Sequence, residues 1–258
     1  MKKVAGFLLL LFAVLALPAQ ENVTVFGGMT GTQLYTDPNG NIYLVNGSKL
    51  SKLDGNGKLL RSFDDSFLGD IHSVDVDNPM KIMVFYRESG KILFLDDRLS
   101  PVMEPLDLFS HGYSTVVFAA YSTDNLIWLY DANSHELICI DFYCKEKSKN
   151  RLNFSDFYPD QLLACQERVL LMNCHDDGIY LFDAFGTFLS RIPLMAGRVV
   201  GYFKGRISYR NENLIGEYDH IALADSRRML PESDCIDVVW NATKLYYLDR
   251  NNRLVIVY

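Results

Sequence analysis

Histidine and carboxylate side chains are the residues of this chain that could hold a metal ion. The chain has 5 histidines, and Asp176 and Asp177 directly follow one of them in the run CHDDG. Three histidines and a carboxylate can form a tetrahedral zinc site. Exposed loop histidines would give the same pattern, so we predict no metal site and keep one alternative set of ligands. That set is His72, His111, His135 and His175.

The sequence contains none of the short motifs that mark a nucleophile, a phosphate loop or a zinc protease. The G-x-S-x-G, Walker, Rossmann and H-E-x-x-H patterns do not occur. The run FGGMTGT at Phe26 is rich in glycine, but no helical pattern follows it that could bind a phosphate. We therefore predict no catalytic residue and no cofactor.

The 5 cysteines are an odd number, so at least one thiol stays unpaired within the chain. Cys165 and Cys174 could flank one hairpin turn, and a disulfide between them is one alternative. Burial as small apolar side chains is the other. The remaining cysteines are Cys139, Cys144 and Cys235.

Residues 1–20 are typical of a secretory signal peptide. Lys2 and Lys3 precede a short apolar run that ends at Leu17, and small residues surround Ala19. The run is shorter than the roughly 20 residues that span a bilayer. No cysteine lies near the expected cleavage site, so we predict no lipid anchor and a periplasmic or secreted protein without a membrane span.

The charge of the chain is acidic, with 25 basic and 32 acidic residues and a net charge of −7. Loss of Lys2 and Lys3 with the leader leaves 23 basic residues and a net charge of −9. Such a chain is a poor candidate for binding nucleic acid or anionic membranes. We expect a protein partner of the envelope or the secreted fraction, and leave the oligomeric state open.

A unit of about 40 residues repeats along the rest of the chain, which is typical of propeller blades. Each unit holds several short strand-like runs, and no helical periodicity of useful length interrupts them. We predict an all-β, six-bladed β-propeller of four-stranded antiparallel blades, as one domain over residues 21–258. The most regular runs begin at Asn41, Lys81, Asn125, Arg168, Arg206 and Lys244.

Aspartates recur at one place in the repeat, directly after the third strand of a unit. An aspartate there can accept hydrogen bonds from backbone N–H groups two residues on and start a tight turn. We therefore assign these residues to turns and not to acid catalysis. They are Asp54, Asp96, Asp141, Asp183 and Asp219.

The two ends of the repeat region fit together. The sixth unit stops after its third strand at Tyr258, and the strand-like run NVTVFGG at Asn22 belongs to no unit. Unpaired sheet edges are prone to aggregate. We expect residues 21–28 to be the closing strand of the last blade.

The stretch DPNGNIYLVNGSKLSKLDGNGKLLRSF at Asp37 resembles an NHL-type repeat, and other units resemble it in part. The resemblance implies a six-bladed β-propeller and says little about activity, since relatives include protein-binding modules, ligand sensors, lyases and lactonases. The matching positions are Asp37, Gly40, Asn41, Tyr43, Asp54, Gly57, Lys58 and Phe63.

Lactonase-type relatives hold a metal with acidic and amide side chains at the starts of their innermost strands. The equivalent starts here do not supply the carboxylates that a calcium-like ion requires. We favour a binding protein on this ground, and keep a metal-dependent hydrolase, lactonase or lyase as the alternative. The starts are Thr32, His72, Thr115, Gln161, Arg198 and Cys235.

The loops that join fourth to first strands and second to third strands share one face of a propeller, called here the loop face. Its aromatic, basic and acidic side chains suit recognition of a partner. We predict a non-catalytic scaffold that binds a protein or a ligand in the cell envelope. The candidate binding residues are Arg87, Glu88, His111, Tyr113, Asp156, Tyr158, His175 and Arg250.

Overall fold

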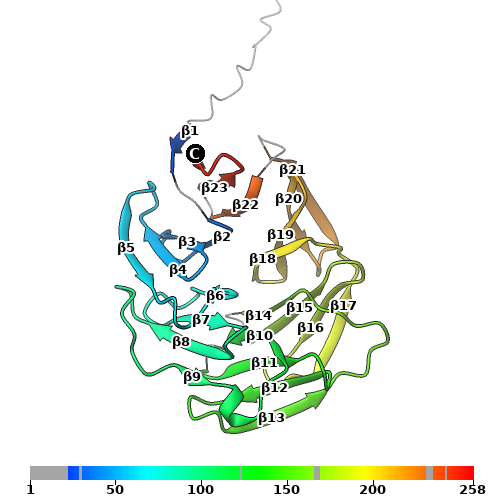
Figure 1. Cartoon of the computed structure of the whole chain (residues 1–258). Helices are drawn as coiled ribbons and strands as arrows, with labels where there is room; N and C mark the ends of the chain where they lie inside the picture. Colours follow the sequence, from blue (N-terminus) through cyan, green and yellow to red (C-terminus); the bar gives the residue numbers. More distant parts are fainter. Residues whose placement is uncertain (1–22, 29–30, 123, 166–168, 231–234, 242) are drawn as a thin grey trace, which may run out of the picture.

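The computed structural model describes residues 23–28, 31–122, 124–165, 169–230, 235–241 and 243–258. Six four-stranded antiparallel sheets, called blades 1 to 6, form a ring (Figure 1). The predicted six-bladed β-propeller is confirmed. The predicted signal peptide lies outside the described residues, and within them no helix is long and apolar enough to cross a membrane.

In each blade the first strand lies nearest the axis of the ring and the others follow outward (Figure 1). Blade 1 consists of β2 (Gln33–Thr36), β3 (Ile42–Asn46), β4 (Lys49–Leu53) and β5 (Leu59–Asp64), and blade 2 of β6 (Ser73–Asp75), β7 (Ile82–Tyr86), β8 (Lys91–Leu95) and β9 (Leu106–Asp107). Blade 3 consists of β10 (Val116–Tyr121), β11 (Ile127–Asp131), β12 (Glu136–Ile140) and β13 (Glu146–Arg151), and blade 4 of β14 (Gln161–Cys165), β15 (Val169–Cys174), β16 (Gly178–Phe182) and β17 (Phe188–Ile192). Blade 5 consists of β18 (Arg198–Phe203), β19 (Arg206–Asn211), β20 (Leu214–Asp219) and β21 (Ala224–Met229), and blade 6 of β22 (Cys235–Trp240), β23 (Leu245–Asp249), β24 (Leu254–Val257) and β1 (Val23–Phe26). The short 3-10 helix η1 (Phe109–His111) lies between blades 2 and 3.

Blade 6 is built from both ends of the described chain. β1 pairs antiparallel with β24, so that Val23 lies opposite Val257 and Phe26 opposite Leu254. The ring of Phe26 also covers Gly57 of blade 1, because a Cβ at Gly57 would come within 2.5 Å of it. β1 therefore completes blade 6 and contacts blade 1.

The apolar core consists of six clusters, one at each junction between neighbouring blades. The second strands of blades 2 and 3 are covered on both faces, since all residues of β7 (Ile82–Tyr86) and of β11 (Ile127–Asp131) are buried. Strands that are buried on both faces have continuous apolar runs and not an alternating pattern. This explains why the repeat is recognised from runs such as IMVFY.

The aspartates after the third strands form the turns that the sequence predicts. The Oδ1 atom of Asp183 accepts the N–H groups of Phe185 at 2.8 Å and Thr187 at 2.9 Å. Because these bonds hold the carboxylates in turns, they have a structural role at these places. Equivalent turns form at Asp54, Asp96, Asp141 and Asp219, and also at Asp249.

All 5 cysteines lie in the described part of the chain and are buried. Cys174 is a free thiol, so the alternative of a bridge between Cys165 and Cys174 is not realised. Burial raises the pKa of Cys174 to about 12 and that of Cys139 to about 11. The cysteines therefore pack as small apolar side chains.

Candidate functional site

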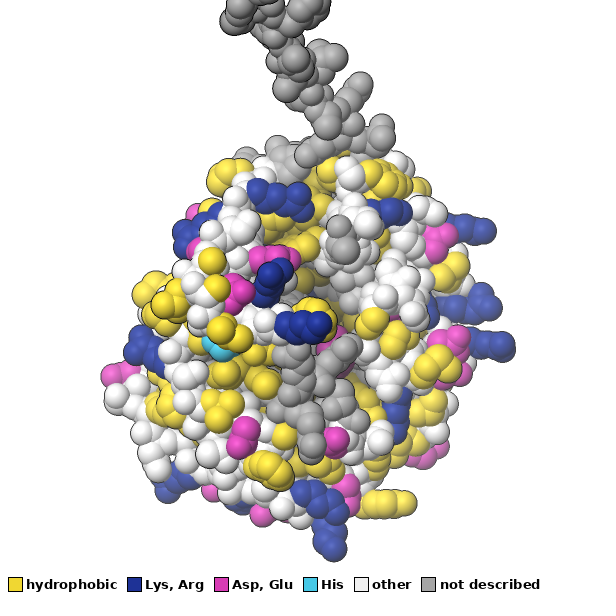
Figure 2. All heavy atoms as spheres, turned by 180° about the vertical axis from the view of Figure 1, so that it is seen from behind, with side chains coloured by type: hydrophobic (Ala, Val, Ile, Leu, Met, Phe, Trp, Pro, Cys, Tyr) yellow, Lys and Arg dark blue, Asp and Glu magenta, His cyan; other side chains and the backbone are white. Residues whose placement is uncertain are grey.

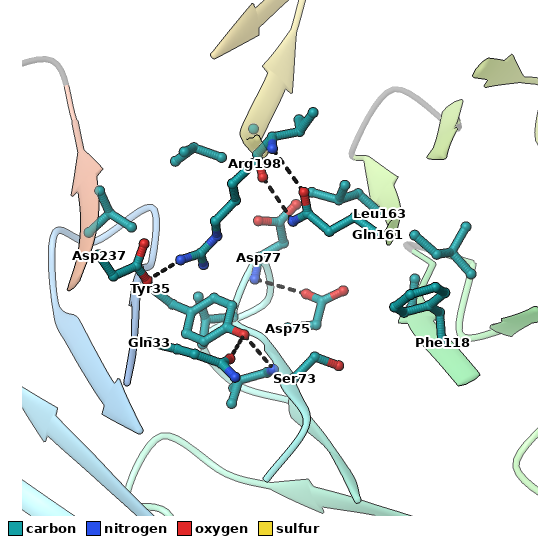
Figure 3. A pocket seen from close by; sticks show the side chains of 18 of the residues that line it. Gln33, Tyr35, Ser73, Asp75, Asp77, Phe118, Gln161, Leu163, Arg198 and Asp237 are labelled. Atoms are coloured by element: carbon teal, nitrogen blue, oxygen red, sulfur yellow. Dashed lines mark hydrogen bonds and ion pairs between the residues drawn. The ribbon is translucent and has the colours of Figure 1, made fainter. Parts of the chain in front are cut away.

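A central cavity of about 670 Å³ runs between the innermost strands of the ring (Figure 3). All six blades contribute lining residues, because each places its first strand beside the axis. Ligand cavities in proteins typically measure about 300–1,000 Å³. The cavity is therefore large enough for a small organic molecule.

Two glutamines in the cavity wall join neighbouring blades. Gln33 of blade 1 donates from Nε2 to the carbonyl oxygen of His72 of blade 2 at 3.1 Å. Gln161 of blade 4 bonds both backbone groups of Val199 of blade 5, at 2.8 Å and 3.0 Å. The hydroxyl of Tyr35 accepts the N–H of Val74 at 3.2 Å and donates to Gln33 at 2.5 Å. These polar groups are used to hold the ring together.

Arg198, Arg210 and Asp237 connect blades 5, 6 and 1 at another part of the wall. Asp237 forms an ion pair with Arg198, and its Oδ2 atom accepts the N–H of Leu34 at 2.7 Å. Arg198 donates to the carbonyl oxygen of Leu34 at 2.9 Å, and Arg210 to those of Ile236 and Cys235 at 2.9 Å. Burial disfavours the charged form of Arg198, but the neighbouring Asp237 carboxylate outweighs that effect. The pKa of Arg198 is therefore raised. This network is a junction between blades.

Asp75 and Asp77 extend into the cavity from blade 2, between Arg198 and Phe118 (Figure 3). Asp75 accepts the backbone N–H groups of Asp77 and Tyr121, each at 3.2 Å. Enclosure by protein and the Asp77 carboxylate raise the pKa of Asp75 to about 7. Enclosure by protein also raises the pKa of Asp77, although the residue as a whole is exposed. The sequence pattern does not single out this pair, because the two carboxylates share a cavity only when the strands are arranged around the axis.

The structure brings some of the predicted loop-face residues together between blades 2 and 3. Arg87 and Glu88 lie in the β7–β8 turn, with 3.4 Å between Nη2 and Oε1. They line an open hollow of about 500 Å³ with Phe109 and Asn133. The Phe109 ring covers Gly90, where a Cβ would come within 2.3 Å of it. This part of the loop face combines an aromatic ring with an ion pair.

A second group of loop-face residues lies over blades 4 and 5. The β13–β14 linker carries Asp156 and Tyr158 and is attached to the β15–β16 turn, because Asp160 accepts the N–H of His175 at 2.8 Å. Nδ1 of His175 lies 3.3 Å from the carbonyl oxygen of Ala196 in the β17–β18 linker. Two linkers and one turn therefore form one connected surface.

The other predicted binding residues do not join these groups directly. His111 is exposed on η1 and its Nδ1 lies 2.8 Å from the carbonyl oxygen of Asp107. Tyr113 is half-buried and packs against the cluster between blades 2 and 3. Arg250 lies in the turn between β23 and β24 of blade 6.

The four histidines of the alternative metal set occupy separate environments. His72 packs edge-on against Phe85, with 5.7 Å between ring centroids, and His135 lies 3.1 Å from the hydroxyl of Tyr130. His111 and His175 bond different backbone carbonyls. In the described residues no three or more His, Cys, Asp or Glu side chains are arranged to hold a metal ion.

Four successive linkers between blades each expose a large apolar side chain on the loop face. These are Phe67 with 99% exposure, Phe109 with 43%, Tyr158 with 74% and Met195 with 59%. The sequence analysis named Tyr158 and missed the other three, although their recurrence before each inner strand was available as a pattern. Hydrophobic, basic and acidic side chains are interspersed on the face seen in Figure 2.

Comparison with known proteins identifies the fold. No protein-family model matches the chain, and no curated protein matches it in sequence. Virginiamycin B lyase from Staphylococcus aureus is similar in structure, with a TM-score of 0.64, 10% identity and coverage of 92% of this chain and 99% of that one. The Pan2 WD40 domain of Neurospora crassa has a TM-score of 0.59 and 7% identity, covering 93% and 96%. BamB from Moraxella catarrhalis has a TM-score of 0.51 and 11% identity, covering 88% and 84%.

At these identities the similarity concerns the architecture alone, because one propeller fold carries many functions. The neighbours include a lyase and other propellers, so they do not select an activity for this chain. The chain is a six-bladed β-propeller, as its resemblance to NHL repeats predicted.

Proposed function

We propose that this protein is an exported, non-catalytic β-propeller that binds a protein partner of the cell envelope through its loop face. The observation that carries the proposal is the set of exposed apolar side chains on successive linkers, of which Phe67, Tyr158 and Met195 are the most exposed. A contiguous exposed apolar patch is typical of an interaction surface. Tyr158 and Met195 lie on the two linkers that hydrogen bonds join into one connected surface. The signal peptide predicted for residues 1–20 supports export.

The charge around these side chains indicates what kind of partner would fit. Asp156 and Asp160 lie in the same linker as Tyr158, and Asp176 lies in the adjoining turn with a fully exposed side chain. Acidic groups around an apolar centre complement a surface with basic residues at its rim. We infer a partner that presents apolar side chains surrounded by lysine or arginine.

The rigidity of the ring favours this role. Side-chain hydrogen bonds such as those of Gln161 join neighbouring inner strands, and the linkers are attached to the turns beside them. Little conformational freedom is then lost when a partner binds, and more of the contact energy appears as affinity. The rigid ring and its attached linkers therefore suit a scaffold that presents a fixed surface to its partner.

The proposal can be tested by affinity purification of the exported protein from its own envelope fraction after chemical cross-linking. We expect a partner in fixed ratio with the wild-type chain and a loss of about tenfold or more in its recovery with Tyr158→Ala or Met195→Ala. The matched control is Phe185→Ala, because Phe185 has 72% exposure and lies in a β16–β17 turn at the opposite face.

Two results would contradict the proposal. One is a wild-type chain that is recovered alone under the same cross-linking conditions. The other is a partner whose recovery depends on Phe185 as much as on Tyr158 and Met195. Cross-links that map to the linkers carrying Phe67 or Tyr158 would support the loop face directly.

A further inference from the structure

Two carboxylates in the central cavity lack a basic partner among the described residues. The ion pairs between described residues involve other acidic side chains, and the Asp77 carboxylate accepts no hydrogen bond from a described residue. Asp75 is bonded by two backbone N–H groups, those of Asp77 and Tyr121. Among the described residues, no basic side chain therefore balances the negative charge of the pair.

The two arginines at the cavity wall do not supply that counter-charge. Arg198 is bonded to Asp237 and to the carbonyl oxygen of Leu34. Arg210 is bonded to two carbonyl oxygens of blade 6 and lies 3.6 Å from Asp237. Their donors are used at the junctions of blades 5, 6 and 1, so neither arginine is paired with Asp75 or Asp77.

The rest of the cavity offers an apolar and aromatic lining beside these carboxylates. Phe118 faces Asp75 across the open space (Figure 3), and Leu163 and Val200 also line the cavity. Aromatic faces attract cations as well as apolar groups. A cavity of about 670 Å³ with an acidic end and an apolar wall suits a molecule that carries one positive charge on an apolar stem.

We propose that the central cavity binds a small organic amine, with its ammonium group between Asp75 and Asp77 and its apolar stem against Phe118. A divalent metal ion fits less well, because calcium takes about 6–8 oxygen ligands and no three or more acidic, histidine or cysteine side chains of the described residues are arranged around an ion. Asp75, Asp77 and Phe118 are not among the residues proposed to bind the protein partner, so this site does not depend on that partner.

The test uses isothermal titration calorimetry of the folded protein with phenethylamine, phenethyl alcohol and calcium chloride. We expect phenethylamine to bind with one-to-one stoichiometry and the uncharged alcohol to bind at least about tenfold more weakly. Asp77→Asn should weaken phenethylamine binding about tenfold or more, because it removes a carboxylate that accepts no hydrogen bond from the described residues. Asp75→Asn is the second variant, and it keeps an oxygen that can accept the Tyr121 N–H.

The matched control is Glu104→Gln, which removes an equal charge from an exposed side chain that does not line the cavity. It should leave the affinity for phenethylamine unchanged. Equal affinity for the amine and the alcohol would overturn the proposal, as would an unchanged affinity in Asp77→Asn. Stoichiometric calcium binding that displaces phenethylamine would overturn it in favour of a metal site.

Discussion

Asp237 and Asp75 both belong to inner strands, yet their surroundings give them different properties. Asp237 is buried beside Arg198 and accepts backbone N–H groups, so its charge is balanced inside the wall. Asp75 has no basic partner, and enclosure with Asp77 raises its pKa to about 7. The residue type alone does not distinguish these two cases, because the difference comes from neighbours on other blades.

The raised pKa of Asp75 predicts a dependence of stability on pH. The folded state holds the proton more tightly than the unfolded chain, whose pKa is near the ordinary 3.8. The folded state therefore binds more protons between pH of about 4 and 7, and the free energy of unfolding falls as pH rises through this window. In Asp75→Asn this contribution is absent, so the variant should gain stability relative to the wild type as pH rises.

Urea unfolding of both proteins at several pH values between about 4 and 7 measures this difference. Glu104→Gln serves as the control, since its exposed side chain should leave the pH profile of the wild type unchanged. Parallel profiles for the wild type and Asp75→Asn would show that Asp75 ionises with an ordinary pKa.

In the turns between third and fourth strands, the contribution of a single side chain to the stability of the fold is the easiest to measure. Asp183 accepts two backbone N–H groups, and Asp183→Ala leaves those of Phe185 and Thr187 without this acceptor. We expect a loss of about 1–2 kcal/mol in the free energy of unfolding. Asp183→Asn keeps an acceptor oxygen and should lose less. Urea unfolding and hydrogen exchange at the Thr187 amide measure the effect, and equal stability of Asp183→Ala and the wild type would contradict it.

Inner and outer strands differ in how well the sequence predicts them. The inner strands and the aspartate turns were predicted because burial on both faces leaves long apolar runs and the turns need particular residues. β13 (Glu146–Arg151) and β21 (Ala224–Met229) were not located, since they are polar strands with exposed side chains at the blade edge. Their pairing comes from the neighbouring strand and not from burial of their own side chains, and charged residues are common on such edges.

The candidate sites follow the same division. The loop-face positions of Arg87, Tyr158 and His175 could be predicted from the order of strands and loops. The cavity pair Asp75 and Asp77 could not, because its properties depend on which side chains the other five blades place around it. The sequence could show that the chain forms a ring, but not which charges inside the ring are balanced.

At the scale of the whole molecule, the junction between blades 6 and 1 joins the two ends of the described chain. Leu34 of blade 1 is bonded to Asp237 of blade 6, and Phe26 of β1 packs in the apolar cluster between the two blades. This junction is therefore closed by polar contacts at the axis and by β1 toward the outside. The contribution of β1 can be measured separately, because Phe26 and Val25 are adjacent but differ in their contacts.

Phe26→Ala removes the ring that covers Gly57 and contacts the cluster of blades 6 and 1. Because Phe26 is half-buried, we expect a loss of about 2 kcal/mol in the free energy of unfolding, below the range for fully buried phenylalanines. Val25→Ala on the exposed side of the same strand should change it by about 0.5 kcal/mol or less. Urea unfolding gives both values, and equal effects of the two substitutions would show that β1 is held by its backbone pairing alone.

Deletion of residues 23–26 tests the pairing itself. Without β1, the apolar strand β24 becomes the outer edge of blade 6 and its free backbone groups can pair with another chain. We expect the deleted chain to form dimers or larger aggregates in size-exclusion chromatography at concentrations where Phe26→Ala stays monodisperse. A deleted chain that keeps the elution volume and the unfolding midpoint of the wild type would show that the ring does not need this strand. If the deleted chain aggregates, β1 not only stabilises blade 6 but also keeps the edge of β24 from pairing with another chain.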